Sequence, residues 1–239
     1  GFYPEGIYTA PTDEDLKRDI EISMGLGFNG ARLHEKIFEP RFLYWADKLG
    51  YLVWGEHANW GLDISGPMGL ERFLPEWLEA LERDFNHPSI VGWCPFNETP
   101  KNQDNEVLRT VYRVTKMVDS TRPVIDTSGY HHVITDILDI HDYDQNPETF
   151  TKRYEPLKRG EGIIADHLGG LEYSKDLCFV SEYGGIWWSP QSEGWGYGER
   201  PKSENEFIER YKALTEALLN HPKMCALCYT QLYDVEQEV

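Results

Sequence analysis

The sequence predicts an α/β fold with a parallel sheet, and three observations point to it. Seven short segments that could form strands follow one another along the 239 residues, several of them separated by helical patterns. These segments are apolar through most of their length, as strands buried on both faces are. Each segment also ends in polar or aromatic residues. In a (β/α)8 barrel, or TIM barrel, all such strand ends meet at one rim, so we expect this fold.

The individual elements follow from their start and stop signals. Strands are expected, in chain order, within "FNGARLHE", "YLVWGEH", "HPSIVGWCPFNE", "RPVIDTSG", "DILDIHDY", "DLCFVSEYGG" and "KMCALCYTQLYD". Helices are expected at about residues 12–25, 41–49, 71–85, 106–119 and 204–220. The first helix opens with Thr12 and acidic residues, which is typical of a capped helix start. No glycine-rich phosphate motif follows the first strand, so nothing supports a dinucleotide-binding sheet.

The domain organisation follows from the strand count. Seven strands are one short of eight, and the chain begins directly with a loop and a helix. We therefore expect the first strand to precede Gly1 and the last helix to follow Val239, which would leave the barrel incomplete at its ends. No low-complexity linker divides the chain, so residues 1–239 are expected to form a single barrel domain excised from a longer multidomain protein.

Composition excludes several classes of partner. The chain has 23 Lys and Arg against 41 Asp and Glu, a formal net charge of −18. Such a field repels nucleic acid and anionic membrane surfaces, so neither is expected as a partner and neutral partners are favoured. No apolar run approaches the roughly 18 to 20 residues that span a bilayer, and the start, "GFYPEGIYTA", lacks a signal-peptide pattern. A signal could lie upstream: without one the cytoplasm is favoured, while periplasmic or secreted placement and a homo-oligomer stay open.

The cysteines and histidines give no metal or redox motif. Cys94, Cys178, Cys225 and Cys228 all fall within apolar runs, and we expect them to be buried free thiols. The last two have the spacing of a zinc or redox pair, but no second pair follows and "KMCALCYT" reads as a strand. The eight histidines show no ligand spacing such as His-Glu-x-x-His. We expect no cofactor and no catalytic metal.

Two glutamates at strand ends are the main functional candidates. Glu98, in "SIVGWCPFNETP", and Glu182, in "CFVSEYGG", each end an apolar strand and precede turn residues. On the rim of one barrel they could face each other across a pocket. Paired carboxylates suit glycoside hydrolysis, in which one group protonates the leaving oxygen and the other attacks or activates water. For each glutamate taken alone, an ion pair or a helix cap is an equally good explanation.

Several motifs resemble the catalytic barrel of glycoside hydrolase family 2, which includes β-galactosidases, β-glucuronidases and β-mannosidases. "FNE" at 96–98 is similar to the family's Asn-Glu acid/base motif at the end of its fourth strand. "SEYGG" at 181–185 is similar to the nucleophile motif that ends its seventh strand. "LKRDIEISMGLGFNGARLHE", "FLYWADKLGYLVWGEH" and "NHPSIVGWCPFNE" look like family segments in the same order, so the resemblance covers nearly the whole chain.

This resemblance implies a retaining O-glycosyl hydrolase acting on terminal β-linked sugars by double displacement. Glu182 would be the nucleophile and Glu98 the acid/base. Asn97 would bind the sugar 2-hydroxyl, although its side chain could instead close a turn. Tyr143 would hydrogen-bond the nucleophile, with a surface-loop aromatic as the alternative. Retention also predicts carboxyl groups about 5 to 5.5 Å apart, against about 6.5 to 9.5 Å for inversion.

The remaining substrate-binding candidates carry open alternatives. His34 matches a histidine that lines the sugar pocket in many members, and a core or surface histidine fits nearly as well. Arg32 would hold the charge of the nucleophile or form a structural ion pair. His141, two residues before the tyrosine in "DIHDYD", joins the substrate-binding set. Trp187 and Trp188 could stack on sugar rings or simply pack their loop, and Trp195, Trp54 and Trp60 are further candidates.

Departures from the family pattern narrow the substrate and leave rival functions. Where many relatives have Asp-Glu at the third strand's end this chain has "GEH", and the Asn-x-Lys motif of glucuronidases is absent, which argues against glucuronides. One rival is a non-catalytic carbohydrate-binding or scaffold module with the same barrel. Another is a retaining barrel glycosidase of a different family. Since β-sandwich domains usually precede the barrel in this family, the isolated chain need not be active.

Overall fold

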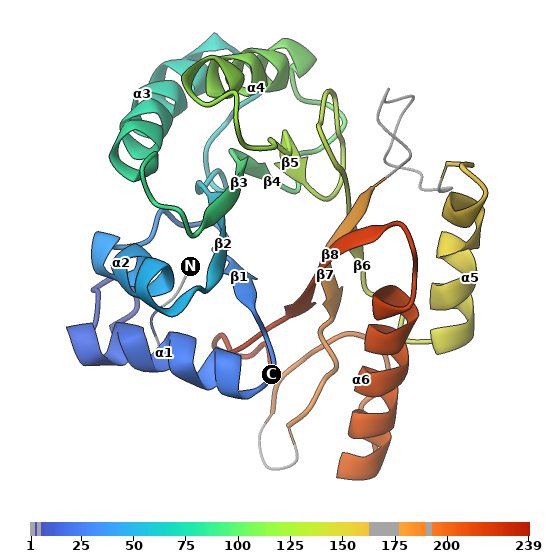
Figure 1. Ribbon diagram of the computed structural model, residues 1–239. Helices are drawn as coiled ribbons and strands as arrows, with labels where there is room; N and C mark the ends of the chain where they lie inside the picture. The colour runs from blue at the N-terminus through green and yellow to red at the C-terminus, as the bar shows by residue number, and fades with distance from the viewer. Residues whose placement is uncertain (1–2, 4–5, 163–176, 190–192) are drawn as a thin grey trace. The chain divides into compact units, whose positions relative to one another are not determined.

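The computed structural model describes residues 3, 6–162, 177–189 and 193–239 of the chain. Its contacts divide it into two compact units (Figure 1), with the described residues up to Ile137 in unit 1 and those from Leu138 onward in unit 2. Each unit is described by itself below. The elements of unit 1 are α1 (Asp13–Gly25), β1 (Gly30–Arg32), α2 (Pro40–Leu49), β2 (Leu52–Glu56), α3 (Pro67–Asp84), β3 (Ile90–Cys94), β4 (Phe96–Asn97), α4 (Asn105–Val118) and β5 (Thr127–Ser128). Those of unit 2 are β6 (Leu138–Asp142), α5 (Pro147–Lys158), β7 (Cys178–Gly184), α6 (Glu204–Leu219) and β8 (Met224–Thr230).

Local signals in the sequence start and stop these helices. Thr12 and Asp15 form a capping box, in which the threonine hydroxyl accepts the N–H of Asp15 and the aspartate accepts that of Thr12. Asp104 and Ser203 cap α4 and α6 in the same way, through side-chain oxygens that accept a backbone N–H. Gly50 ends α2 in the left-handed conformation, at φ 73°.

Among the described residues, β1 to β8 pair with one another in parallel. In unit 1, β1, β2 and β3 form one sheet in that order and β4 pairs with β5, while a single parallel bridge joins Trp93 to Val124. In unit 2, β6, β7 and β8 form a sheet in that order. Helices connect most neighbouring strands, as parallel pairing requires. The carboxyl ends of the strands in each sheet therefore lie at one edge.

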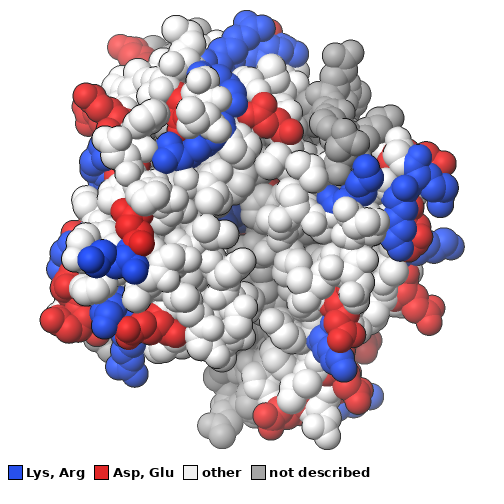
Figure 2. Space-filling model, viewed as in Figure 1, with Lys and Arg blue, Asp and Glu red and all other residues white. Residues whose placement is uncertain are grey.

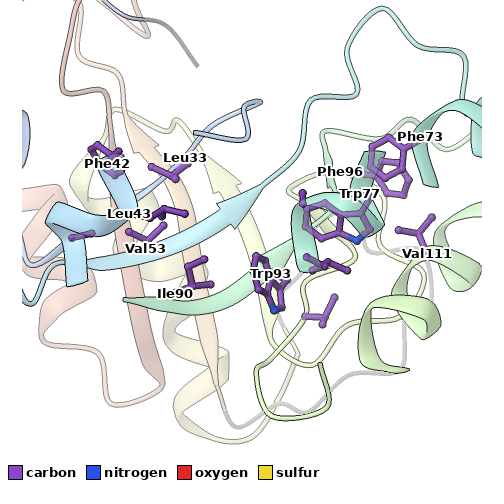
Figure 3. Close-up of a cluster of buried hydrophobic side chains, with 14 of the residues drawn as sticks. Leu33, Phe42, Leu43, Val53, Phe73, Trp77, Ile90, Trp93, Phe96 and Val111 are labelled. Atoms are coloured by element: carbon purple, nitrogen blue, oxygen red, sulfur yellow. The ribbon is translucent and has the colours of Figure 1, made fainter. Parts of the chain in front are cut away.

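The core of unit 1 lies between its strands and its helices (Figure 3). Leu33, Val53 and Ile90 come from the strand region, while Phe42 and Leu43 from α2 pack against them. Farther along, the fully buried indole of Trp77 on α3 lies edge-on to that of Trp93 on β3, with ring centroids 5.9 Å apart. Aromatic pairs of this kind add stability beyond the area they bury, and they fix the strands whose ends carry polar residues.

The structure confirms all seven predicted strand segments and the five predicted helices, with helix ends shifted by at most a few residues. It divides "HPSIVGWCPFNE" into β3 and β4 at Pro95, since proline has no N–H to donate to a ladder. The sequence analysis missed one helix, α5. Its apolar spacing is irregular and Pro156 lies inside it, but Asn146 caps its first turn and Pro147 occupies its first position. The single-domain assignment stays a prediction.

Two surface properties bear on the earlier expectations. Among the described residues, no helix is both long and apolar enough to cross a bilayer. On the face drawn in Figure 2, acidic and basic side chains are interspersed, so the net charge of −18 is not gathered in one patch there.

All four cysteines are free, as predicted, but only Cys94 and Cys178 are buried. The burial prediction was wrong for Cys225, which is exposed on β8, and for the half-buried Cys228.

Candidate active site

Three strands of unit 1 end in polar residues that contact one another. Arg32 ends β1, Glu56 ends β2 and Asn97 ends β4. The guanidinium of Arg32 forms a bidentate ion pair with Glu56, with Nε–Oε2 and Nη2–Oε1 distances of 2.5 and 2.9 Å. Its Nη2 also donates to Asn97 Oδ1 at 2.7 Å. We call Arg32, His34, Glu56, Asn97 and Glu98 the Arg32 cluster.

The ion pair inside this cluster is buried, with 3% of the Arg32 side chain and none of the Glu56 side chain exposed. Burial by itself would raise the pKa of Glu56, but the charge of Arg32 and contacts with His34 outweigh it and lower that pKa. Glu56 therefore stays ionised at neutral pH. Within unit 1, the contacts of Arg32 are those of a structural ion pair, the second of the two roles expected for it. A role of Arg32 in holding the charge of the nucleophile stays a prediction.

The contact with Arg32 also fixes which way the amide of Asn97 faces. Arginine only donates hydrogen bonds, so the atom that faces it must be the amide oxygen. The Nδ2 of Asn97 is buried and has no hydrogen-bond partner among the described residues. Because a buried donor without a partner is costly, Asn97 presents a donor suited to a hydroxyl of a bound ligand or to water.

Glu98 follows β4 directly and has an unusual backbone. Its φ is 48°, in the left-handed region that residues other than glycine seldom adopt. Its N–H donates to the carbonyl oxygen of Ser128, at the end of β5, at 2.8 Å. The side chain is half-buried. A strained backbone held by neighbouring strand ends is typical of functional sites.

His34, a member of the Arg32 cluster, contacts both its ion pair and a neighbouring tryptophan. His34 Nδ1 lies 3.1 Å from Arg32 Nη2 and 3.5 Å from Glu56 Oε1. The imidazole meets the indole of Trp60 edge-on, with ring centroids 5.8 Å apart. Trp60 is 62% exposed. His34 therefore lies just after the end of β1, beside the exposed ring of Trp60. That it lines a sugar pocket stays a prediction.

The second group of candidates lies in unit 2, around Glu182 on β7. Residues His141 and Glu182 are register partners on the paired strands β6 and β7. The hydroxyl of Tyr143 donates a short hydrogen bond to Glu182 Oε2, and His141 Nδ1 lies 3.3 Å from the same oxygen. Glu182 is only 8% exposed. We call His141, Tyr143 and Glu182 the Glu182 cluster.

Neighbouring side chains hold Tyr143 in this position. Its ring stacks on that of Tyr197, with centroids 3.6 Å apart and planes 6° from parallel. The amide of Gln145 donates to the carbonyl oxygens of Tyr143 and Gly184. Burial and the charge of Glu182 raise the pKa of Tyr143 far above its usual value. The phenol therefore remains protonated and can serve as a hydrogen-bond donor to Glu182 across the working pH range.

Gly185 makes room for the stacked tyrosines. Its φ is 56°, and a Cβ on it would lie 2.5 Å from Tyr197 Cδ2 and 3.1 Å from Tyr143 Cε1. A side chain would both strain the backbone and push the tyrosine rings. The second glycine of "SEYGG" is thus explained by the space that the Tyr143 ring needs.

The two tryptophans after β7 have separate surroundings. Trp187 is half-buried, lies beneath the guanidinium carbon of Arg200 at 5.7 Å, and its Nε1 has no partner among the described residues. Trp188 packs against Phe207 of α6, with centroids 5.4 Å apart. These contacts favour loop packing for Trp188 and leave Trp187 as the better sugar-binding candidate. The same loop includes residues 190–192, which lie outside the described residues.

Sequence reasoning missed four residues that hold the candidates in place: Glu35, Asn59, Gln145 and Tyr197. Of the four, Glu35 lies at the end of the predicted strand segment "FNGARLHE" but was not singled out there. A signal existed for Tyr197, because "GWGYGE" surrounds it with glycines that admit close ring packing. Glu35 and Asn59 lie in loops, where no periodicity marks a side chain that binds backbone.

Residues 9–165 match a family model described as "Glycosyl hydrolases family 2, TIM barrel domain". The chain belongs to glycosyl hydrolase family 2. A relative in this family, β-galactosidase 2 of Enterobacter cloacae, is 33% identical over 134 residues, which are 52% of this chain and 12% of the relative. The β-galactosidase of Photobacterium profundum is 30% identical over 138 residues, 53% of this chain and 13% of that protein. The chain thus spans only a small part of these relatives.

Two solved structures have a similar fold. A β-glucuronidase from Bacteroides uniformis matches with a TM-score of 0.73 at 22% identity, over 98% of this chain and 30% of that one. A family 2 β-galacturonidase from Eisenbergiella tayi, bound to galacturonate, matches with a TM-score of 0.73 at 19% identity, over 96% and 42% of the two chains. Together with the family match, these likenesses support the α/β barrel fold predicted from the sequence.

Proposed function

We propose that the chain carries the two catalytic glutamates of a retaining β-glycosidase that acts on a terminal β-linked sugar, with units 1 and 2 as parts of one (β/α)8 barrel. The observation that carries the proposal is the hydrogen bond from Tyr143 to Glu182. A nucleophilic carboxylate must be ionised and aimed, and a phenol held by stacking supplies a fixed donor to it. Glu98, after an Asn97 that presents a buried donor, is the second carboxylate.

The reaction proceeds in two displacements. A carboxylate oxygen of Glu182 attacks the anomeric carbon while Glu98 gives its proton to the departing glycosidic oxygen. Glu98, now ionised, then removes a proton from water, whose oxygen attacks the same carbon and breaks its bond to Glu182. The sugar leaves with its original β configuration, and both glutamates return to their starting states. No cofactor or metal takes part in these steps.

Asn97 and the aromatic residues supply substrate contacts in this proposal. The free Nδ2 of Asn97 donates to the 2-hydroxyl next to the reacting carbon. His34 and Trp187 line the sugar pocket. Galactosides are the first substrates to test, because the relatives of 30% identity or more are named β-galactosidases. Glucosides and mannosides come next.

The test is turnover of a panel of aryl β-glycosides by the full-length protein and by its Glu182→Gln variant. We expect hydrolysis of at least one β-glycoside and a loss of about 10³-fold or more in the variant, since a covalent nucleophile has no substitute. Glu199→Gln, which changes an exposed glutamate of unit 2, is the matched control and should keep full activity. Circular dichroism should show the same folded state in all three proteins.

Two outcomes contradict the proposal. Equal activity in the parent and in Glu182→Gln would remove Glu182 as the nucleophile. A folded full-length protein that hydrolyses no glycoside but binds sugars would instead identify a non-catalytic carbohydrate-binding module.

A further inference from the structure

We propose that Asn59 is a positioning residue that sets the direction of the acid/base Glu98, and that Glu35 orients the loop that carries Asn59. The inference rests on the function proposed above, which makes Glu98 the proton donor. Its evidence is a continuous set of hydrogen bonds inside unit 1, and the sequence analysis gave neither Glu35 nor Asn59 a role.

The peptide unit that joins Asn97 to Glu98 is held at both of its polar atoms. Its carbonyl oxygen accepts a hydrogen bond from Asn59 Nδ2 at 3.1 Å. Its N–H donates to the carbonyl oxygen of Ser128 at 2.8 Å. Because a peptide unit is planar, two hydrogen bonds on its opposite sides fix its rotation and therefore the direction in which the Glu98 side chain leaves the backbone.

Asn59 binds the backbone of Asn97 a second time. Its Oδ1 accepts the N–H of Asn97 at 2.6 Å, so one amide side chain pairs with both the donor and the acceptor of a single residue. Asn59 is only 7% exposed. Glu98 needs such support because its left-handed backbone, at φ 48°, persists only where the surroundings over-determine it.

Glu35 in turn holds the backbone around Asn59. Both of its carboxylate oxygens lie 3.1 Å from the N–H nitrogen of Asn59, and Oε2 accepts the N–H of Trp60 at 3.0 Å. Burial and the charge of Glu56 raise the pKa of Glu35, while these two N–H groups act in the opposite direction. The hydrogen bonds thus run from Glu35 through Asn59 to the peptide unit before Glu98.

The test compares leaving groups. An unsubstituted phenolate needs a proton from Glu98 as it departs, whereas dinitrophenolate departs without one. We therefore measure kcat/KM for the phenyl and dinitrophenyl β-glycosides of the sugar that the full-length protein hydrolyses. The variants are Asn59→Asp, which keeps the acceptor and loses the donor to Asn97, Asn59→Leu, which loses both, and Glu35→Gln.

A positioning role predicts a selective loss. Asn59→Asp and Asn59→Leu should lower kcat/KM for the phenyl glycoside about 10- to 100-fold, part of the range that general acid catalysis contributes, and for the dinitrophenyl glycoside less than about 3-fold. Glu35→Gln should show the same selectivity with a smaller loss. Asn220→Asp, at the exposed end of α6, should change neither value.

Two further results separate the inference from the proposed function. Glu98→Ala must show the same selectivity more strongly, and if it does not, the proposed function fails. If Glu98→Ala behaves as expected while the folded Asn59 variants lose both activities equally or neither, the positioning role is overturned. The fraction of folded protein, measured by thermal unfolding, corrects every rate, and a variant too unstable to measure is replaced by Asn59→Gln under the same criteria.

Discussion

The hydroxyl of Tyr143 donates a hydrogen bond to the carboxylate of Glu182, and the two residues lie on the neighbouring parallel strand regions of β6 and β7. Stacking on Tyr197 holds the phenol, and its raised pKa keeps it protonated. Ring packing thus fixes the position of this hydrogen-bond donor, and the donor carries no charge of its own. A hydrogen bond donated to a buried carboxylate favours its ionised form.

Removal of that hydroxyl should slow the reaction without unfolding the protein. In Tyr143→Phe the ring still stacks on Tyr197, but Glu182 loses a hydrogen bond to a charged group, worth about 1.5 to 3 kcal/mol. We expect kcat to fall roughly 10- to 150-fold. Tyr44→Phe, which removes a hydroxyl from a half-exposed ring on α2, is the control. A Tyr143→Phe enzyme with full activity would contradict the account.

Removing one partner of the buried Arg32–Glu56 ion pair should destabilise the protein more than replacing both partners by apolar residues. Arg32→Met or Glu56→Leu alone leaves an unpaired buried charge, and each should lower the free energy of unfolding by about 3 to 5 kcal/mol. The double variant should lose much less than the sum of the two. Urea unfolding of the four proteins measures this coupling. Strictly additive losses would show that the two side chains do not act as a pair.

Substitution by alanine should be harmful at Gly185 for two reasons, and at Gly160 for only one of them. Both have a positive φ, 56° and 73°, so alanine at either site costs about 1 to 2 kcal/mol. Only at Gly185 would the new Cβ meet Tyr197 and Tyr143, since no atom of the described residues lies within 4 Å of a Cβ at Gly160. We expect Gly185→Ala to lose activity. Gly160→Ala should keep its activity, and its loss of stability should be no larger than that of Gly185→Ala. Equal activity in both variants would exclude the proposed role of the glycine.

His57 should make unit 1 less stable at mildly acidic pH. Burial among Phe73 and Trp77 lowers its pKa, against smaller opposing effects of the Ala58 carbonyl and Glu76. The folded pKa lies below the unfolded one, so between the two only the unfolded chain binds the proton. Stability contributed by neutral His57 is present above about pH 6.5 and is lost as the pH falls toward the folded pKa.

The measurement is the difference in unfolding free energy between the parent and His57→Phe as a function of pH. All other ionisable groups are the same in both proteins, so their contributions to the difference cancel. The parent should lose stability relative to the variant below about pH 6.5, by at most about 1.4 kcal/mol per pH unit, which is the effect of one proton. A difference that stays constant from about pH 8 to about pH 5 would contradict the assignment.

Strand ends were predictable from the sequence because burial on both faces makes each strand continuously apolar up to its first polar residue. That rule placed Arg32 and Asn97 at the ends of β1 and β4, where the structure has them. It was wrong for Glu182, because β7 continues two residues further, to Gly184. Helix α5 escaped because its start depends on the Asn146 cap and not on apolar spacing.

The supporting residues were not predictable for a different reason. Asn59 and Glu35 act on backbone atoms of segments that are distant in the sequence, and any asparagine or glutamate in a loop has the same local pattern. The left-handed backbone of Glu98 is likewise invisible, because it follows from hydrogen bonds to Ser128 and Asn59 after the strands have paired.

The most direct test of the central claim is mass spectrometry of the full-length protein after reaction with a 2-deoxy-2-fluoro β-glycoside that accumulates the glycosyl-enzyme. The account predicts one sugar per protein, attached in a proteolytic peptide at Glu182, with release on adding an acceptor and no labelling of Glu182→Gln. A sugar attached at another residue, or first-formed product of the α configuration with no covalent intermediate, would contradict it.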